Sequence, residues 1–212
     1  MNERTIAVVA AGLSQPSSTR MLADRLAEAA VRDLDRRGLT ARVETIELRD
    51  IARDVTNNML TGFPSPALDE VISKVTGADG VIAVTPVFSA SYSGLFKSFV
   101  DILDPKSLAG MPVLIGATGG SERHSLALEY AMRPLFTYLH SVVVPTAVYA
   151  SSADWAGAHG GAGAPSALKE RIDRAGFEFG ALVADSDRSS RVLDPFELTG
   201  DFASSIGGFE VS

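Results

Sequence analysis

The sequence contains no cysteine among its 212 residues. Disulfide scaffolds, thiolate zinc sites and cysteine nucleophiles are therefore excluded. Long hydrophobic runs are also missing, because no apolar stretch reaches the ~18 residues that a membrane span needs. The N-terminal segment lacks the succession of charged, apolar and cleavage regions that marks a secretory signal. These absences predict a cytoplasmic protein with no membrane segment.

Positive charge is scarce as well. The chain has 19 Lys and Arg against 26 Asp and Glu, a formal net charge of −7, and its basic residues form no stripe. Nucleic acid is therefore not an expected partner. His124, His140 and His159 lack the spacing of metal ligands, so the sequence predicts no metal site.

Three nucleotide and hydrolase motifs are absent too. The pattern Gly-x-x-x-x-Gly-Lys of ATP-binding loops does not occur, nor does the Gly-x-Gly-x-x-Gly of dinucleotide domains. The Gly-x-Ser-x-Gly turn of serine hydrolases is missing as well. An ATPase, a Rossmann dinucleotide domain and a hydrolase of this type are therefore disfavoured.

What the chain does have is an alternation of short apolar runs with stretches of helical period. Strands are predicted over residues 6–10, 41–48, 80–85, 112–117 and 142–149. Helices are predicted over residues 21–37, 66–76, 95–103, 122–139 and 166–185, with a disturbance at Pro134, whereas 49–65 is expected to be irregular. This alternation is typical of a three-layer α/β fold, and five parallel strands favour the flavodoxin-like order 2-1-3-4-5.

The composition changes near the C-terminal end. Residues 155–165 are rich in Gly and Ala, which is more typical of a linker than of a phosphate cradle because no strand precedes them. We expect one domain over residues 1–185 and a mostly irregular tail over 186–212.

In a sheet of this order, ligands bind beyond the carboxyl ends of the strands. The first loop at this end carries Ser14, Ser17, Ser18 and Thr19 just before a predicted helix. Hydroxyls and backbone N–H groups at a helix N-terminus can bind a phosphate. The same residue types also cap helices, and the two interpretations are about equally supported.

Two further loops lie at the same end of the sheet. The second contains Pro86, Val87, Phe88 and Ser89, whose extended backbone can face a planar heterocycle, with Phe88 and Tyr92 packing beside the ring or closing the core. The third contains Thr118, Gly119 and Gly120, where the missing Cβ atoms allow close approach of a ligand or simply serve a turn. Each signal is weak alone, and their shared location strengthens them.

These segments resemble the NAD(P)H-dependent FMN reductases with a flavodoxin-like fold, and most closely the members that supply reduced flavin to two-component luciferase-like and alkanesulfonate monooxygenases. The resemblance spans about residues 4–150. It rests on residues 16–23, on the Thr-Pro loop and helix of 85–101, and on residues 117–124 with 130–134. In this chain, Ser14 stands where many members have Arg, and Phe88 replaces the usual Tyr.

The resemblance implies roles for the three loops. Ser17 and Thr19 would bind the FMN phosphate, with Ser14 and Ser18 nearby. Pro86, Val87, Phe88 and Ser89 would line the isoalloxazine ring, and Thr118, Gly119 and Gly120 would flank it from the other side. Because hydride passes from nicotinamide C4 to flavin N5, no catalytic acid or base is expected.

The resemblance also implies partners and leaves alternatives open. The expected ligands are FMN and NAD(P)H, the expected protein partner is a flavin-dependent monooxygenase, and helix 122–139 would build a homodimer or homotetramer with a π-like widening near Tyr130. A quinone or azo reductase that keeps its flavin uses the same fold. A flavodoxin-like electron carrier without NAD(P)H activity is the non-enzymatic alternative.

Overall fold

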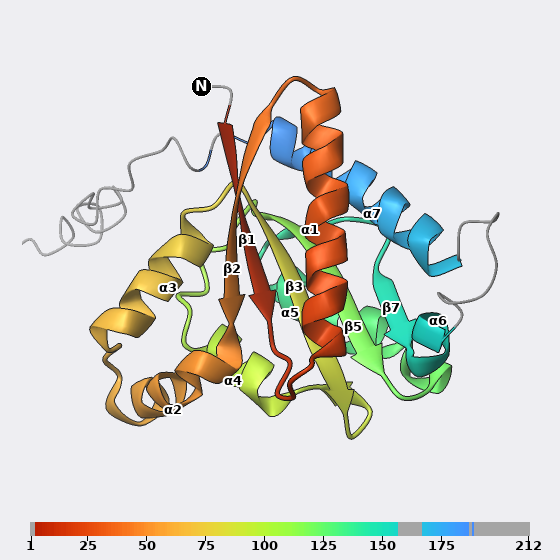
Figure 1. Cartoon of the computed structure of the whole chain (residues 1–212). Helices are drawn as coiled ribbons and strands as arrows, with labels where there is room; N and C mark the ends of the chain where they lie inside the picture. The colour runs from red at the N-terminus through yellow and green to blue at the C-terminus, as the bar shows by residue number, and fades with distance from the viewer. Residues whose placement is uncertain (1–2, 157–166, 187, 189–212) are drawn as a thin grey trace, which may run out of the picture.

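A computed structural model describes residues 3–156, 167–186 and 188 of the chain. Its centre is a seven-stranded sheet in the order β2-β1-β3-β5-β6, in which β4 pairs with β3 and β7 pairs with β5 (Figure 1). All these pairings are parallel except that of β3 with β4. The strands are β1 (Glu3–Ala10), β2 (Thr40–Glu47), β3 (Gly80–Phe88), β4 (Ser91–Tyr92), β5 (Pro112–Gly119), β6 (Val142–Val143) and β7 (Val148–Ser151).

Helices cover both faces of the sheet, which confirms the predicted flavodoxin-like α/β class (Figure 1). The α-helices are α1 (Ser18–Arg36), α2 (Ala52–Thr61), α3 (Pro66–Thr76), α4 (Gly94–Asp101), α5 (Arg133–Tyr138), α6 (Ser152–Ala156) and α7 (Ala167–Ala184). The 3-10 turns are η1 (Leu48–Ile51) and η2 (Glu122–His124), and η3 (Leu128–Met132) is a π-helix.

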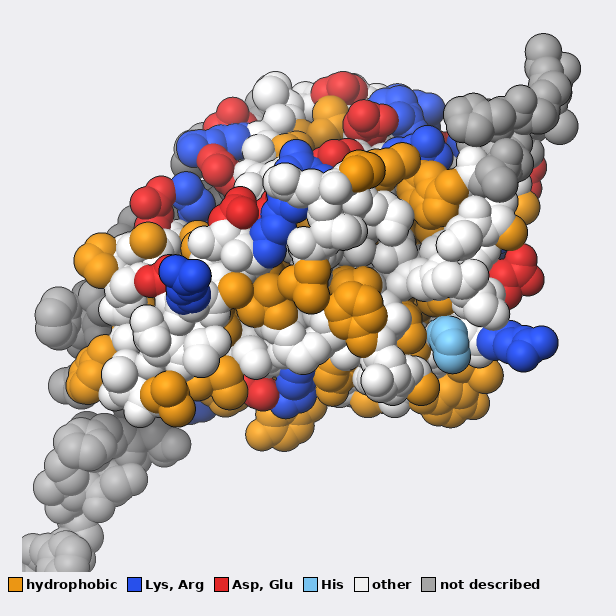
Figure 2. Space-filling view, turned by 60° about the horizontal axis from the view of Figure 1, so that its bottom comes forward, with side chains coloured by type: hydrophobic (Ala, Val, Ile, Leu, Met, Phe, Trp, Pro, Cys, Tyr) orange, Lys and Arg blue, Asp and Glu red, His pale blue; other side chains and the backbone are white. Residues whose placement is uncertain are grey.

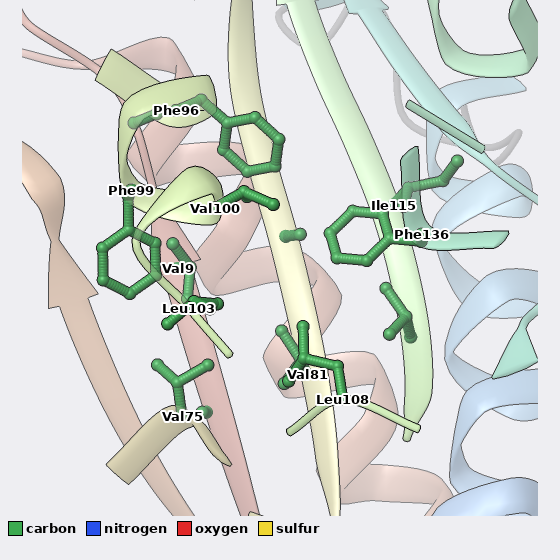
Figure 3. Close-up of a cluster of buried hydrophobic side chains, with 14 of the residues drawn as sticks. Val9, Val75, Val81, Phe96, Phe99, Val100, Leu103, Leu108, Ile115 and Phe136 are labelled. Atoms are coloured by element: carbon green, nitrogen blue, oxygen red, sulfur yellow. The ribbon is translucent and has the colours of Figure 1, made fainter. Parts of the chain in front are cut away.

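The core is divided by the sheet into two clusters. Because side chains alternate along a strand, Val8 packs with the α1 and α7 side, while Val9 packs with the α2 to α5 side. On the latter side, the Phe96 and Phe136 rings meet at an angle of 61°, with centroids 6.3 Å apart (Figure 3). Each fully buried Phe stabilises the fold by roughly 1.5–3 kcal/mol. This rigid double-sided core holds the carboxyl ends of the strands in place.

The structure corrects the predicted strand count of five. The segment predicted as one strand over residues 142–149 instead contains β6 and the start of β7, which both pair with β5. Pro145 lies between them, and a proline has no N–H for the ladder. The additional β4 folds back on β3 as an antiparallel hairpin.

Two helical segments also depart from or refine the sequence prediction. Residues 49–65 are not irregular, because η1 and α2 occupy most of them, with Val55 and Asn58 as the buried positions of α2. Predicted helix 122–139 is divided into η2, η3 and α5, and the widened turn expected near Tyr130 is confirmed by the π-helix. The last predicted helix is confirmed as α7.

Parts of the predicted domain organisation lie outside the described residues. These are positions 157–165 of the predicted linker and positions 187 and 189–212 of the predicted tail. Among the helices that the structure describes, none is long and apolar enough to cross a membrane.

Candidate functional site

The three predicted loops meet around one cavity of about 370 Å³ at the carboxyl ends of β1, β3 and β5. Figure 2 turns this end of the molecule forward and shows hydrophobic side chains spread among polar groups and backbone. The described residues that line the cavity are Gly12, Leu13, Ser14, Ser18, Thr19, Pro86, Val87, Phe88, Thr118, Gly119, Gly120, Ser152 and Trp155. A cavity of this size and mixed lining is typical of a small-molecule site.

The first loop is shaped by the start of α1. Ser17 is the N-cap of this helix, and its Oγ accepts a hydrogen bond from Arg20 N at 3.2 Å. A Cβ at Gly12 would lie 2.1 Å from that Oγ, so only glycine leaves room for the cap. The capping role of Ser17 is thus present, and it fixes the helix N-terminus beside the cavity.

Thr19 connects the first loop to the third. Its buried Oγ1 lies 2.8 Å from Oγ1 of Thr118, and either hydroxyl can donate in this hydrogen bond. Ser18, in contrast, is exposed and lines the cavity. The partial positive charge of the α1 N-terminus favours an anion here, because the first backbone N–H groups have no partners within the helix.

The second loop is the tip of the β3–β4 hairpin. Ser89 and Ala90 form its turn with φ angles of 48° and 68°, in the left-handed region that non-glycine residues rarely adopt. Phe88 lines the cavity and is 48% exposed. Tyr92 packs on Phe96 with a ring-centroid distance of 5.9 Å, which supports its alternative role of closing the core.

The two glycines of the third loop differ in their surroundings. A Cβ at Gly119 would lie 2.2 Å from the Tyr149 hydroxyl, which donates a 2.7 Å hydrogen bond to the Ser121 carbonyl. Burial, followed by the charge of Asp154, raises the pKa of Tyr149, so the phenol keeps the proton that it donates. A Cβ at Gly120 would meet nothing within 4 Å, and its φ is not positive. Gly120 therefore faces open space.

All of the predicted binding residues line this cavity except Ser17 and Ser89. Ser17 lies just behind the lining as the cap, and Ser89 lies at the exposed hairpin turn. Ser152 and Trp155 of α6 also line the cavity and were not predicted from the sequence, Trp155 because its segment is typical of a linker. Arg25 on α1 places its guanidinium carbon 4.8 Å from the Trp155 ring centroid, an arrangement typical of a cation–π contact.

A second cavity, of about 410 Å³, is a less suitable site. Its described lining residues are Glu122, Ser125, Leu128, Glu129, Ala147, Tyr149, Asp154 and Arg171, which all follow the third loop in the chain. Two of its acidic side chains already have partners, because Glu129 pairs with Arg133 and Asp154 with Arg171. The smaller cavity combines a helix N-terminus, a hairpin and a glycine pair, so it is the better candidate for a ligand site.

In the part of the chain that the structure describes, no group of three or more His, Cys, Asp or Glu side chains is arranged to hold an ion.

The fold is flavodoxin-like, and the candidate cavity lies at the carboxyl ends of its parallel strands. Residues 4–156 match the family described as NADPH-dependent FMN reductase, and the chain belongs to this family.

Comparison with individual proteins agrees with this membership. The chain is 35% identical to an FMN reductase (NADPH) of Pseudomonas aeruginosa over 150 residues, covering 71% of this chain and 78% of that protein. It is 36% identical to the NADH-dependent FMN reductase SfnE of Pseudomonas putida over 152 residues, with the same two coverages. An oxidoreductase structure from Corynebacterium diphtheriae matches with a TM-score of 0.81 and 45% identity, covering 88% of this chain and all of that one.

Proposed function

We propose that this protein catalyses the NAD(P)H-dependent reduction of FMN in the cavity between the three loops. The observation that carries this proposal is the meeting of a hydroxyl-rich helix N-terminus, an extended hairpin and a glycine pair in one cavity. Membership of the NADPH-dependent FMN reductase family supports it.

The residues present fit FMN both at its phosphate end and at its isoalloxazine ring. The α1 N-terminus with Ser14, Ser17, Ser18 and Thr19 would hold the phosphate, because hydroxyl and N–H donors suit an anion. At the other end, Pro86, Val87 and Phe88 would line one side of the ring, with Ser89 beside them at the hairpin turn. Thr118, Gly119 and Gly120 would line the other, where the open space at Gly120 leaves room for a planar group.

The protein contributes binding and orientation to this reaction. Bound FMN would supply the hydride acceptor for the reduced nicotinamide. The Thr19–Thr118 hydrogen bond ties the phosphate end to the ring end, and the Tyr149–Ser121 hydrogen bond fixes the third loop. Holding two reactants in a fixed relative orientation lowers the entropic part of the barrier. No side chain needs to transfer a proton in the hydride step.

The first test measures the oxidation of NADH and of NADPH, with FMN, FAD, riboflavin and a quinone in turn as the electron acceptor. We expect turnover with FMN, and a higher KM for riboflavin because it lacks the phosphate. Relatives named for NADPH and for NADH both match, so both coenzymes are included. Turnover with the quinone but not with free FMN would indicate a flavin-retaining reductase, and no turnover with any acceptor an electron carrier.

Further parts of the proposal concern partners and domain organisation. We propose that the reduced flavin passes to a partner monooxygenase, as the sequence resemblance implies, and that residues 1–185 form the reductase domain with 186–212 as its tail. The cytoplasmic location stays a prediction from the sequence.

We also propose a homodimer or homotetramer built on the π-helix and α5. Tyr130 and Tyr138 are 79% and 72% exposed, and Leu126, whose carbonyl accepts a hydrogen bond from Tyr130 N, is 62% exposed. Large apolar side chains exposed together are typical of an interaction surface. We expect light scattering to give a multiple of the 22.3 kDa chain mass. Replacing Tyr130 and Tyr138 by Ser should lower that mass, whereas replacing Phe63, exposed near the end of α2, should not. A monomer at all working concentrations would contradict the proposal.

A further inference from the structure

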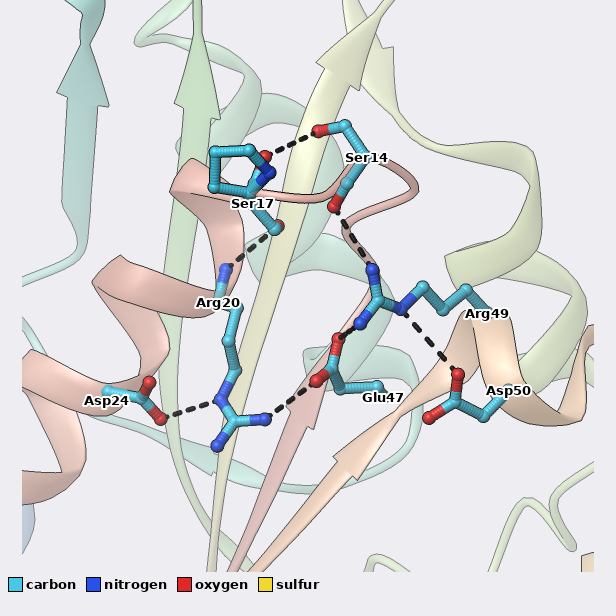
Figure 4. A network of polar contacts seen from close by, with 8 residues as sticks. Ser14, Ser17, Arg20, Asp24, Glu47, Arg49 and Asp50 are labelled. Atoms are coloured by element: carbon cyan, nitrogen blue, oxygen red, sulfur yellow. Dashed lines mark hydrogen bonds and ion pairs between the residues drawn. The ribbon is translucent and has the colours of Figure 1, made fainter.

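The first loop carries no charge of its own to match a phosphate, because residues 12–19 contain neither Lys nor Arg. Two arginines from neighbouring elements lie against it. Arg20 belongs to the first turn of α1, and Arg49 belongs to η1, directly after β2. Figure 4 shows both guanidinium groups joined in one polar network with the loop.

Glu47 is the centre of this network. Its Oε1 lies 2.8 Å from Nη1 of Arg20, and its Oε2 lies 2.7 Å from Nη2 of Arg49 (Figure 4). Arg20 also pairs with Asp24 at 2.7 Å, and Nε of Arg49 lies 3.6 Å from Asp50. Each arginine therefore faces carboxylates, so the network ties α1, β2 and η1 together and does not present unmatched positive charge to the cavity.

Arg49 is the member of the network that reaches the loop backbone. Its Nη1 donates a 3.1 Å hydrogen bond to the Ser14 carbonyl. The side-chain oxygen of Gln15, in the amide orientation that satisfies both partners, lies 3.0 Å from Nη1 and 2.6 Å from Nη2. The Arg49 side chain is only 18% exposed, whereas residues 13–16 are all exposed. These loop residues have little packing of their own, so the guanidinium is a main anchor for them.

The anchor sets the direction of a peptide group in the cavity wall. Ser14 lines the cavity, and its carbonyl oxygen accepts the hydrogen bond from Arg49. In a planar trans peptide, the C=O and the following N–H point in opposite directions. The Gln15 N–H is therefore directed away from Arg49. Ser14 Oγ also donates to the Pro16 carbonyl at 3.1 Å, so the hydroxyl and the main chain are fixed together.

We propose that Arg49 is a positioning residue for FMN, which holds the phosphate-binding loop in its binding conformation before the ligand arrives. This inference rests on the proposed function of the cavity. A loop that is ordered in advance loses less conformational freedom on binding, which increases affinity. The effect acts on the phosphate end, so FMN should depend on Arg49 much more than riboflavin does.

The test compares Arg49→Gln with Arg42→Gln as a matched control. Arg42 lies on β2 and pairs with Glu44 at 2.5 Å, but its side chain is 63% exposed and does not contact the loop. Affinities for FMN and riboflavin are measured by flavin fluorescence, together with kcat and KM. Hydrogen exchange of the amides in residues 13–18 is measured without flavin.

For Arg49→Gln we expect FMN affinity to fall about tenfold and riboflavin affinity to change less than about twofold. KM for FMN should rise while kcat stays within about twofold, and the loop amides should exchange faster without ligand. Arg49→Lys should give an intermediate loss of FMN affinity, because lysine keeps the positive charge but lacks the planar fork of donors. If Arg49→Gln does not fold, Arg49→Lys takes its place in the same comparison. Arg42→Gln should match the wild type in every measurement.

Failure of the proposed function and failure of the positioning role of Arg49 give different results. If the wild type does not bind FMN, the proposed function is wrong, and the exchange measurement still reports whether Arg49 orders the loop. If the wild type binds FMN, equal losses of FMN and riboflavin affinity in Arg49→Gln would assign Arg49 to general stability. Unchanged affinity and exchange would overturn the positioning role altogether.

Discussion

FMN affinity falls about tenfold to a hundredfold when Ser17 and Thr19 are both replaced by alanine, while riboflavin affinity barely changes. Hydrogen bonds to a charged group contribute roughly 1.5–3 kcal/mol, which corresponds to this range. Riboflavin has no phosphate, so its binding does not depend on these hydroxyls. Flavin fluorescence titrations with both ligands measure the difference directly. Equal losses for the two flavins would remove the phosphate assignment.

A cap on another helix provides the control for this double variant. Ser17 caps α1, so its loss also lowers the free energy of unfolding by about 0.5–2 kcal/mol. Ser65 caps α3 in the same way, accepting a 3.3 Å hydrogen bond from Leu68 N, and it does not line the cavity. Ser65→Ala should therefore lose comparable stability and keep wild-type FMN affinity. This comparison separates ligand binding from helix capping.

Gly120→Val abolishes most NAD(P)H-dependent FMN reduction while the protein remains folded. The structure leaves space for a side chain at Gly120, and this residue lines the cavity. Inserting a side chain where a ligand must pack costs roughly 1–3 kcal/mol, so we expect a loss of kcat/KM of about fivefold to a hundredfold. Because φ at Gly120 is not positive, the melting temperature should shift by no more than about 2 °C.

Gly38→Val is a control that should lower stability and leave FMN affinity unchanged. Gly38 has a φ of +77° after the end of α1, and the strand that follows, β2, runs toward the cavity from there. Valine at that φ strains the backbone by about 1–3 kcal/mol, so stability should fall while FMN affinity is kept. If Gly120→Val instead behaved like Gly38→Val, losing stability but reducing FMN normally, Gly120 would be only a turn residue.

Much of this site was predictable because its loops follow strongly apolar strands. The apolar run 6–10 predicted β1, and the runs 80–85 and 112–117 predicted β3 and β5 in the same way. Parallel strands place their carboxyl ends at one edge, so the loops after them had to be neighbours. The position of the cavity therefore follows from the order of the strands, without knowledge of any tertiary contact.

Other features depend on contacts that no local pattern reveals. The hairpin turn uses Ser89 and Ala90 at positive φ, where a turn signal would require Gly or Asn. Helix α2 was missed because one of its buried positions is Asn58, a polar residue. Trp155 reaches the cavity only because α6 follows β7 at the same edge of the sheet. The sequence pattern is the same whether Ser17 caps the helix or binds the phosphate, because both roles need a hydroxyl at this position.

The central claim is that FMN binds between the three loops with its phosphate at the start of α1. A crystal structure of the protein with FMN tests this most directly. We expect the phosphate within hydrogen-bond distance of Ser17, Thr19 and the first backbone N–H groups of α1, and the ring between the β3–β4 hairpin and Gly120. Flavin density in the cavity lined by Tyr149, Asp154 and Arg171, with the space at the α1 N-terminus left to solvent, would contradict the account.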